Sequence, residues 1–319
     1  IMCLFQLFTI FGVKEKPLPK QLMKTPPMKI KDMFKVLFKN DQLMWCALVL
    51  LLFSVGTNVV GGGLGMMYIY FDNAYNGTLW MVFGIGFAIS STVFTLFYPG
   101  LAKKYGRNKL FYSCGIAIIA GYAIMMIFGL TVPKIELFTL SIPFLNLNLT
   151  ITLRYLLMFL AYAVAGWGGG LYMIMVINIT NTVEYNEFKT GKRDEGLIFA
   201  LRPFTSKLAS ALSQGMVSLV YIIANVLPYT NRLTEIDRKL STETPEQVVA
   251  AVQADNPTGI NVLLVCTCVI PMVFLAVALI IYKKKCVLNE SRMNEIIATI
   301  DARKAEEAEK ENADEEVTA

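Results

Sequence analysis

The chain has 319 residues, of which 55% are hydrophobic and 17% are charged, and its mean hydropathy is +0.53. A soluble globular domain averages about a quarter charged residues, so this composition and its regularly spaced apolar stretches indicate a membrane protein. The net charge is +5, no histidine is present, and none of the six cysteines forms a C-x-x-C pair. We therefore expect no metal site, no disulfide framework and no histidine-based catalysis.

The first 12 residues are apolar, but a membrane span needs about 20 residues. They lack the basic start and the small-residue end of a signal peptide. We predict that residues 1–12 are the end of a transmembrane helix whose start is missing, in a truncated chain. In residues 13–43, apolar side chains recur at helical spacing between lysines, which predicts a cytoplasmic central loop with an amphipathic helix at the membrane interface. A solvated linker is the alternative.

A six-helix transmembrane bundle is predicted for residues 44–282. Its spans are 44–71, 78–101, 110–132, 152–182, 197–228 and 259–282. The loops alternate between lysine-rich segments and segments with few positive charges, so the positive-inside rule places the basic loops in the cytoplasm. The lysines lie in these loops rather than on one continuous surface, so we expect no nucleic-acid partner. The predicted fold class is an all-α membrane protein.

Two segments outside the spans carry helix signals. In the outer loop, Thr244-Pro245-Glu246 combines a polar cap with proline at the first helical position. The tail of residues 283–319 is predicted to be cytoplasmic. Its residues Met293, Ile296, Ile297 and Ile300 predict a short amphipathic helix, and we expect an unstructured acidic end from Glu306.

Two glycine runs occupy matching places in the first and fourth spans. Gly61–Met67 (GGGLGMM) resembles Gly168–Met173 (GGGLYM), and the two spans open units of three helices that cross in opposite directions. Glycine-interrupted segments at matching positions of an inverted 3+3 repeat are typical of a transporter's binding site. Chance similarity is an equally weighted alternative, because glycine is common in membrane helices.

Lys207 is the main candidate functional residue. It lies 12 residues after Glu195, a depth of about 18 Å at 1.5 Å per residue, near the middle of a bilayer core about 30 Å thick. Intramembrane charges usually mark substrate or ion pathways, although a structural ion pair with a neighbouring helix is the alternative. No carboxylate of these spans lies at the same depth, so the partner of Lys207 is expected to be a substrate, an ion-linked acid or a residue on another segment.

Three uncharged residues are further candidates for sugar contacts. Asn58 lies midway along its span, where its amide suits either a sugar hydroxyl or a helix–helix hydrogen bond. Trp167 and Tyr172 lie away from the interfaces where aromatic belts form, and their rings suit either stacking on a pyranose or packing.

The inner turn between the fourth and fifth spans holds a mixture of acidic and basic residues: Glu184, Glu187, Lys189, Lys192, Arg193, Asp194 and Glu195. This mixture predicts a salt-bridge network that forms in one conformation and separates in another. The alternative is a solvated loop.

The stretch Glu184–Gly196 (EYNEFKTGKRDEG), followed by Phe204-Thr205-Ser206-Lys207-Leu208, closely resembles the glycoside–pentoside–hexuronide:cation symporter family, which includes the melibiose carriers. The tail around Ser291–Ile296 and Ala302–Lys304 and the turn Pro99–Asn108 are similar to that family as well. The resemblance covers essentially the whole chain, as the carboxyl half of a twelve-helix carrier. It implies a major-facilitator fold and sugar uptake coupled to sodium, proton or lithium.

The resemblance also implies residue roles. Lys207 matches the functional lysine of the eleventh helix, and Tyr172 matches the aromatic residue presented to the sugar. Thr205 is expected beside them in the sugar site. Glu184, Glu187 and Arg193 match charged residues of the inner gate, to which we add Glu195.

The chain also departs from the family's pattern. Asn181 stands where melibiose carriers have aspartate, and Lys103 stands at a usually acidic position. The cation-binding aspartates belong to the amino half, which is not in this chain, so the coupling ion is not assigned.

The resulting hypothesis is a cation-coupled secondary symporter for a glycoside or related sugar, in the cell membrane, with no cofactor and no enzymatic activity. It would work together with the amino-terminal six-helix half. A carrier of lysolipids or other amphiphiles is one alternative, and a non-transporting six-helix membrane scaffold is another.

Overall fold

The computed structural model describes residues 12, 38–142, 147–191, 194–286, 288 and 290–318, without the side chains of residues 141, 142, 147, 148 and 307–318. The chain divides into two compact units, residues 1–36 and 37–319. The predicted helix end at 1–12 and amphipathic helix within 13–43 fall outside the described residues, apart from Gly12 and residues 38–43. The second unit is described below.

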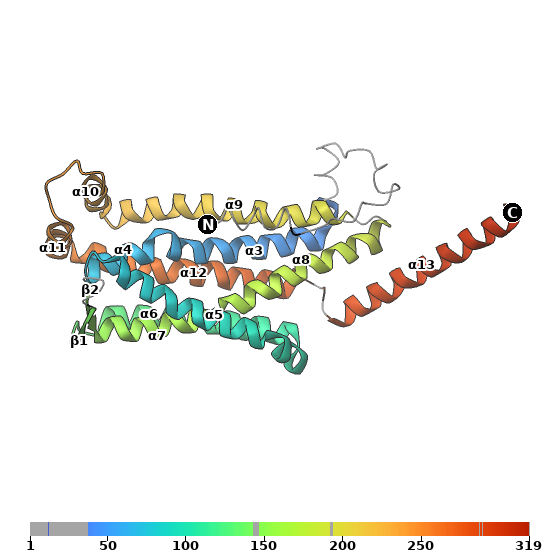
Figure 1. Ribbon diagram of the computed structural model, residues 1–319, viewed down its shortest axis with the longest axis horizontal. Helices are drawn as coiled ribbons and strands as arrows, with labels where there is room; N and C mark the ends of the chain where they lie inside the picture. Colours follow the sequence, from blue (N-terminus) through green and yellow to red (C-terminus); the bar gives the residue numbers. More distant parts are fainter. Residues whose placement is uncertain are drawn as a thin grey trace. The chain divides into compact units, whose positions relative to one another are not determined.

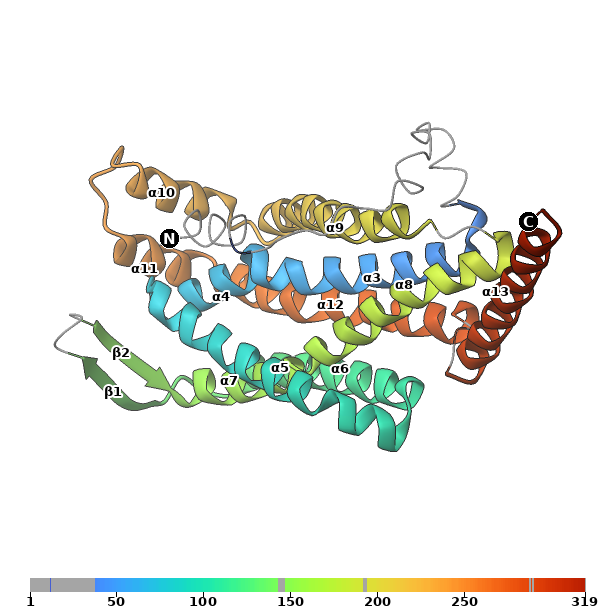
Figure 2. The same ribbon diagram turned by 45° about the vertical axis from the view of Figure 1, so that its right-hand side comes forward.

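Six helical segments of the second unit are long and apolar enough to cross a membrane, which confirms the six predicted spans. They are Asp41–Asp72, Gly77–Tyr105 (α5), Arg107–Thr131 (α6), Leu153–Thr190, Glu195–Ile223 (α9) and Pro257–Lys285 (α12). The first span consists of α3 (Asp41–Val59), a kink at Val60–Leu64 (η2) and α4 (Gly65–Asp72), and the fourth of α7 (Leu153–Ala165) and α8 (Gly168–Thr190). Helix α3 packs against α12 and α9, and α6 packs against α7 and α12 (Figures 1 and 2).

Polar side chains at the helix starts explain where several spans begin. Asn40, Asn76, Thr152 and Asn256 each accept a hydrogen bond from a backbone N–H in the first turn of α3, α5, α7 and α12. Between α5 and α6, Gly106 has φ 80°, a conformation that only glycine adopts readily, so the chain reverses there within one residue. The spans are thus bounded by local sequence signals, and their apolar faces pack together.

The first glycine run contains a break in a helix, and the second run directly follows one. Gly63 leaves the helical conformation (φ 158°, ψ −44°) between α3 and α4, and Gly166 and Trp167 form a turn between α7 and α8. The sequence analysis predicted glycine-interrupted segments at these two places. Of these three residues, only Gly63 departs from helical dihedrals, whereas Gly166 and Trp167 keep them in a tighter turn.

Gly166 is required because the backbone of α5 lies against it. A Cβ at this buried position would be 2.5 Å from the Phe87 carbonyl oxygen, a backbone atom that cannot rotate away. We expect Gly166→Ala to lower the free energy of unfolding by about 2 kcal/mol through overpacking. Gly84→Ala on α5 is the matched control, since a Cβ there meets no atom within 4 Å. Thermal unfolding in detergent measures both; a Gly166→Ala variant as stable as Gly84→Ala would contradict this packing.

The segments between the spans contain the one departure from an all-α fold among the described residues. Strands β1 (Glu136–Ile142) and β2 (Leu147–Thr152) form an antiparallel hairpin with Leu140 opposite Leu149, where the sequence analysis expected a plain loop. Two further outer helices, α10 (Leu227–Asp237) and α11 (Pro245–Asp255), follow α9. The predicted start at Thr244 is confirmed, because Thr244 and Gln247 form a capping box.

Asp72 lies at the outer end of the first span in a buried ion cluster. Its Oδ1 is 3.0 Å from the Lys134 ammonium and 3.0 Å from an Arg154 guanidinium nitrogen, and its side chain is only 5% exposed. Arg154 also donates a hydrogen bond to the Val132 carbonyl, at 2.6 Å. The cluster joins α4, α7 and the segment before the hairpin.

Helix α13 (Glu290–Thr318) follows the last span. Met293, Ile296 and Ile300 are buried together with Leu288 against Tyr185 and Phe188 of α8, as expected for an amphipathic helix, whereas Ile297 is 42% exposed. The backbone stays helical to Thr318, so the expectation of an unstructured end from Glu306 is wrong for these residues.

Candidate functional site

A cavity of about 370 Å³ opens beside both helix breaks. It is lined by Phe53, Thr57 and Asn58 of α3, Gly61 of the kink, Phe87 and Ser91 of α5, Tyr122 of α6, Tyr162 of α7, and Gly168, Gly169 and Tyr172 of α8. Five aromatic rings and several hydroxyl or amide groups therefore surround one space. Such a mixture suits a small ligand with apolar faces and many hydroxyl groups.

Asn58 and Tyr172, two of the predicted contact residues, line this cavity together. Asn58 is half-buried, and within the described part of the chain its amide makes no hydrogen bond. Neighbouring Thr57 differs, because its hydroxyl bonds to carbonyls of its own helix at 3.1 and 3.2 Å. The Asn58 amide is therefore a donor and acceptor available to a ligand.

Tyr172 is held by Arg202 of α9. The guanidinium donates hydrogen bonds of 3.2 and 2.9 Å to the Tyr172 hydroxyl, and its carbon lies 5.6 Å from the ring centroid. The two contacts fix the orientation of the ring and combine charge-assisted hydrogen bonding with a cation–π interaction. The sequence analysis missed this contact, because the two residues are 30 positions apart.

Two other predicted contact residues lie elsewhere. Trp167 lines a different, larger pocket between α5 and α6, with its ring 5.6 Å from that of Phe94. Thr205 is 4% exposed, and its hydroxyl donates to the Leu201 carbonyl at 2.8 Å. The structure therefore brings Asn58 and Tyr172 together but not Trp167 or Thr205.

Lys207 is exposed on α9 and does not line the cavity. In the part of the chain that the structure describes, its ammonium has no ion pair or hydrogen bond. The same helix exposes Arg202, Ser206, Ser210, Gln214 and Ser218.

The exposed surface of α9 has two different faces. At 100° per residue, Arg202, Ser206, Ser210 and Gln214 fall on one side, next to Lys207. Phe204, Leu208 and Leu219 fall on the other. Polar and charged side chains are unfavourable where a helix faces lipid. This stripe therefore suits contact with a second polar surface or an aqueous cavity.

The inner end of α8 is bound to the start of α3. Asp41 accepts hydrogen bonds from the Lys189 ammonium at 2.8 Å and from the Tyr185 hydroxyl at 3.0 Å. The Asn40 amide donates to the Thr182 carbonyl at 3.0 Å. These contacts hold two spans together at the end where the charged turn lies.

The predicted gate residues have different surroundings. Glu187 pairs with Lys304 of α13 at 2.7 Å, while its neighbour Phe188 accepts a hydrogen bond from Arg303 through its carbonyl at 3.0 Å. The Asn181 Nδ2 is buried without a hydrogen-bond partner among the described residues. Glu184 is half-buried and Glu195 is exposed, and both have partners. Arg193 lies outside the described residues.

The cavity has a size and a mixed lining that suit a small polar ligand, and none of the described side chains that line it is charged. Among the described residues, no group of three or more histidine, cysteine, aspartate or glutamate side chains could hold a metal ion. Sequence reasoning missed Phe87, Ser91, Tyr122 and Tyr162 as cavity residues. These residues come from three different helices and meet only when the bundle is packed, so no local sequence pattern identifies them as a group.

Comparison with known proteins gives consistent matches. A family model described as MFS/sugar transport protein matches residues 1–283. The chain is 26% identical to the raffinose carrier protein of Pediococcus pentosaceus over 308 residues, which are 94% of this chain and 41% of the relative. It is 26% identical to the lactose permease of Leuconostoc lactis over 99% of this chain and 42% of that protein.

A further relative is the uncharacterized symporter YnaJ of Bacillus subtilis (strain 168), with 26% identity over 79% of this chain and 45% of that protein. The chain thus spans about two fifths of the length of the curated relatives it matches, between 41% and 45% for the three described here.

Proposed function

Because this chain belongs to the MFS/sugar transport protein family, we propose that it forms the carboxyl-terminal bundle of a cation-coupled secondary symporter for a glycoside or related sugar. The family match agrees with the resemblance to the glycoside–pentoside–hexuronide:cation symporters. The relatives named as a raffinose carrier and lactose permeases make raffinose and lactose the first substrates to test. The chain carries no enzymatic activity in this proposal, since transport requires no covalent step.

The cavity beside the two helix breaks is the observation that carries this proposal. It offers the Asn58 amide, which has no hydrogen bond to any described residue, and the Tyr172 ring, oriented by Arg202, within one space of about 370 Å³. A pyranose has hydroxyl groups around its edge and C–H groups on its faces. The Asn58 amide would hydrogen-bond a hydroxyl, and the Tyr172 ring would stack on a face.

A second six-helix bundle would complete the transporter. The polar stripe of α9, with Lys207, would face the amino-terminal half, and the coupling sodium, proton or lithium ion would bind mainly on that half. The two bundles would rock about the sugar site, as in carriers built from inverted repeats. The matching helix breaks in the first and fourth spans support a 3+3 repeat within this bundle.

In the cell membrane, one end of the bundle would face the cytoplasm and the other end would face the outside. Lysine-rich turns at Lys103–Lys109 and Lys283–Lys285 favour a cytoplasmic position for that end and for the C-terminus. The contacts of Asp41 with Lys189 and of Glu187 with Lys304 lie at this end. They would form the inner gate together with Asn181, Glu184, Arg193 and Glu195, the residues expected there from the sequence. Both ion pairs join helices of this bundle, so they would separate only if α8 moved relative to α3 and α13.

Substitution of Asn58 tests the sugar site. We expect Asn58→Ala to raise KM for the transported sugar about five- to tenfold, because a lost hydrogen bond to a ligand costs roughly 1 kcal/mol. Thr131→Ala is the control, since Thr131 is exposed at the end of α6 and its hydroxyl bonds only to the Ile127 carbonyl. Uptake of labelled lactose, raffinose and a lysolipid by cells expressing the full-length protein gives the comparison. An unchanged KM would place the sugar elsewhere, and uptake of the lysolipid alone would replace the sugar proposal with the amphiphile carrier.

A further inference from the structure

A groove of about 820 Å³ lies between α5 and α6, separate from the cavity that holds Asn58. Its walls are apolar and aromatic, formed mainly by Phe94, Phe97, Leu101, Leu110 and Trp167. The groove and the cavity share no lining residue. On α5, Phe87 and Ser91 face the cavity, whereas Phe94, Phe97 and Leu101 face the groove.

The groove runs inward from the basic end of the bundle. Its lining residues on α5 extend from Ser90 to Tyr105, a length of about 22 Å at 1.5 Å per residue. A bilayer is about 40–45 Å thick with its headgroup regions, so one leaflet is about 20–22 Å thick. The groove therefore has the depth of one leaflet, with a mouth at the level where lipid headgroups lie.

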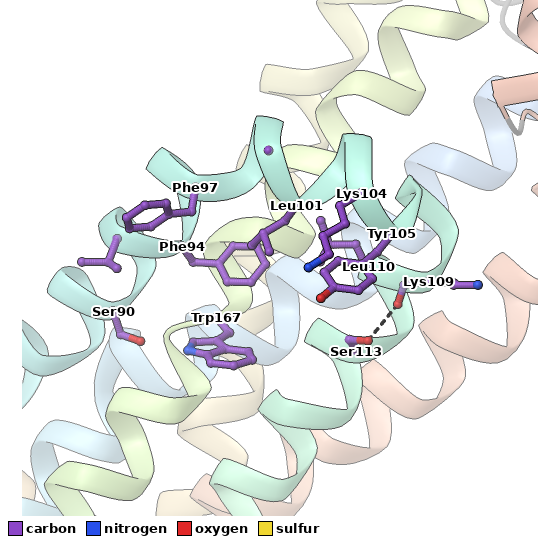
Figure 3. A pocket seen from close by; sticks show the side chains of 12 residues that line it. Ser90, Phe94, Phe97, Leu101, Lys104, Tyr105, Lys109, Leu110, Ser113 and Trp167 are labelled. Carbon is purple, nitrogen blue, oxygen red and sulfur yellow. Dashed lines mark hydrogen bonds between the residues drawn. The ribbon is translucent and has the colours of Figure 1, made fainter.

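Two polar groups point into this apolar space near its mouth. Figure 3 shows the Lys104 ammonium and the Tyr105 hydroxyl directed into the groove, while the Lys109 ammonium points away from it. The Lys104 ammonium lies 5.0 Å from the Tyr105 ring centroid, and in the described part of the chain it has neither an ion pair nor a hydrogen bond. Glu290, at the same end, pairs with Arg107 at 3.4 Å. A cation and a hydroxyl donor are thus presented together without an anion.

We propose that this groove binds one anionic phospholipid, with its phosphate on Lys104 and Tyr105 and an acyl chain along Phe97, Phe94 and Trp167. Apolar walls alone do not select a ligand within a membrane, because lipid tails are as apolar as the side chains they replace. The charge is the selective element, and basic pockets between membrane helices bind anionic headgroups. The bound lipid would contact both α5 and α6 near Gly106, the single residue that links the two helices. The proposal does not depend on the transported substrate.

Lys103 provides a matched control for this proposal. It is the neighbour of Lys104 on the same helix and is equally basic and exposed, but it does not line the groove. If binding came only from a general attraction of lysines to anionic lipid, loss of the Lys103 charge and loss of the Lys104 charge would weaken binding to a similar extent. A specific headgroup site would depend on Lys104 alone.

Gly100 allows a second variant that leaves every charge in place. It lines the groove, and a Cβ there meets no atom within 4 Å. A Gly100→Leu side chain would therefore enter the groove without displacing protein atoms, and leucine is favourable in a helix. This variant should fold normally and exclude the acyl chain.

The test measures binding of fluorescent phosphatidylglycerol, and of a matched phosphatidylcholine, to the purified full-length protein in detergent. We expect tighter binding of phosphatidylglycerol, a roughly fivefold loss with Lys104→Gln, a comparable or larger loss with Gly100→Leu, and no change with Lys103→Gln. Inorganic phosphate should not displace the lipid, because it lacks the acyl chain.

Three results would overturn the proposal. Equal losses with Lys103→Gln and Lys104→Gln would indicate diffuse surface attraction, and displacement by inorganic phosphate would indicate a simple anion site. Absence of phosphatidylglycerol binding to the wild-type protein would mean that another polypeptide segment covers the groove. This experiment does not measure sugar uptake. Failure of the lipid-site proposal can therefore be distinguished from failure of the proposed sugar transport.

Discussion

Replacement of Lys207 by alanine is expected to abolish sugar accumulation, with a loss of about 100-fold or more in the ratio of internal to external substrate. The ammonium lies on the polar stripe of α9 and has no ion pair within the described residues. If its partner is a carboxylate of the amino-terminal half, removing the lysine leaves that carboxylate unpaired inside the membrane. Such a loss costs roughly 3–5 kcal/mol, which corresponds to 100-fold or more.

Two further variants separate loss of function from loss of fold. Lys207→Arg keeps the charge and should retain part of the accumulation. Lys283→Ala removes a lysine from the exposed end of α12 and should transport normally. Accumulation of labelled sugar in cells, at matched expression levels, gives the comparison. Full accumulation by Lys207→Ala would remove this residue from the mechanism.

The second large effect is expected at Asp72. Replacement of this aspartate by asparagine leaves the Lys134 and Arg154 charges together without their shared carboxylate. The Asp72 and Arg154 side chains are only 5% and 17% exposed, so solvent screens the loss poorly. We expect the free energy of unfolding to fall by about 3 kcal/mol, the lower end for a broken buried pair, because Lys134 is 38% exposed.

Double substitution tests whether the charges cause this loss. Asp72→Asn combined with Lys134→Gln removes one of the two unpaired cations and should recover part of the stability. Glu235→Gln on the exposed side of α10 is the control for loss of one acidic charge and should change stability by less than about 0.5 kcal/mol. Thermal unfolding in detergent measures all three. If Asp72→Asn were as stable as Glu235→Gln, the ion cluster would not support the outer end of the bundle.

Local signals made the spans and their ends predictable. Apolar length alone located six spans, Thr244-Pro245 located the start of α11, and the glycine runs marked both helix breaks. The hairpin at 136–152 was missed because its strands are short and lie within an outer loop, where a membrane pattern predicts no regular structure. Helix starts, turns and breaks depend on residues that are close together in the chain, so they can be predicted from a single sequence.

Contacts between distant residues were not predictable in the same way. Asp72 is buried because Lys134 and Arg154, 62 and 82 positions away, converge on it. Trp167 and Tyr172 are five positions apart, about 140° around a helix at 100° per residue, and they line different pockets. Depth in the membrane follows from the sequence, whereas the direction of a side chain depends on the packing of its helix.

Protection of a thiol in the cavity tests most directly whether a sugar binds beside the two helix breaks. Gly61→Cys is suited to this test, because Gly61 lines the cavity, a Cβ there meets no atom within 4 Å, and the proposed ligands Asn58 and Tyr172 stay intact. Gly84→Cys on α5 is equally open but lies outside the cavity. The measured quantity is the rate of alkylation in a background with the six native cysteines replaced. Saturating lactose or raffinose should slow alkylation of Gly61→Cys several-fold and leave Gly84→Cys unchanged, whereas equal rates with and without a sugar that the protein transports would contradict the proposed site.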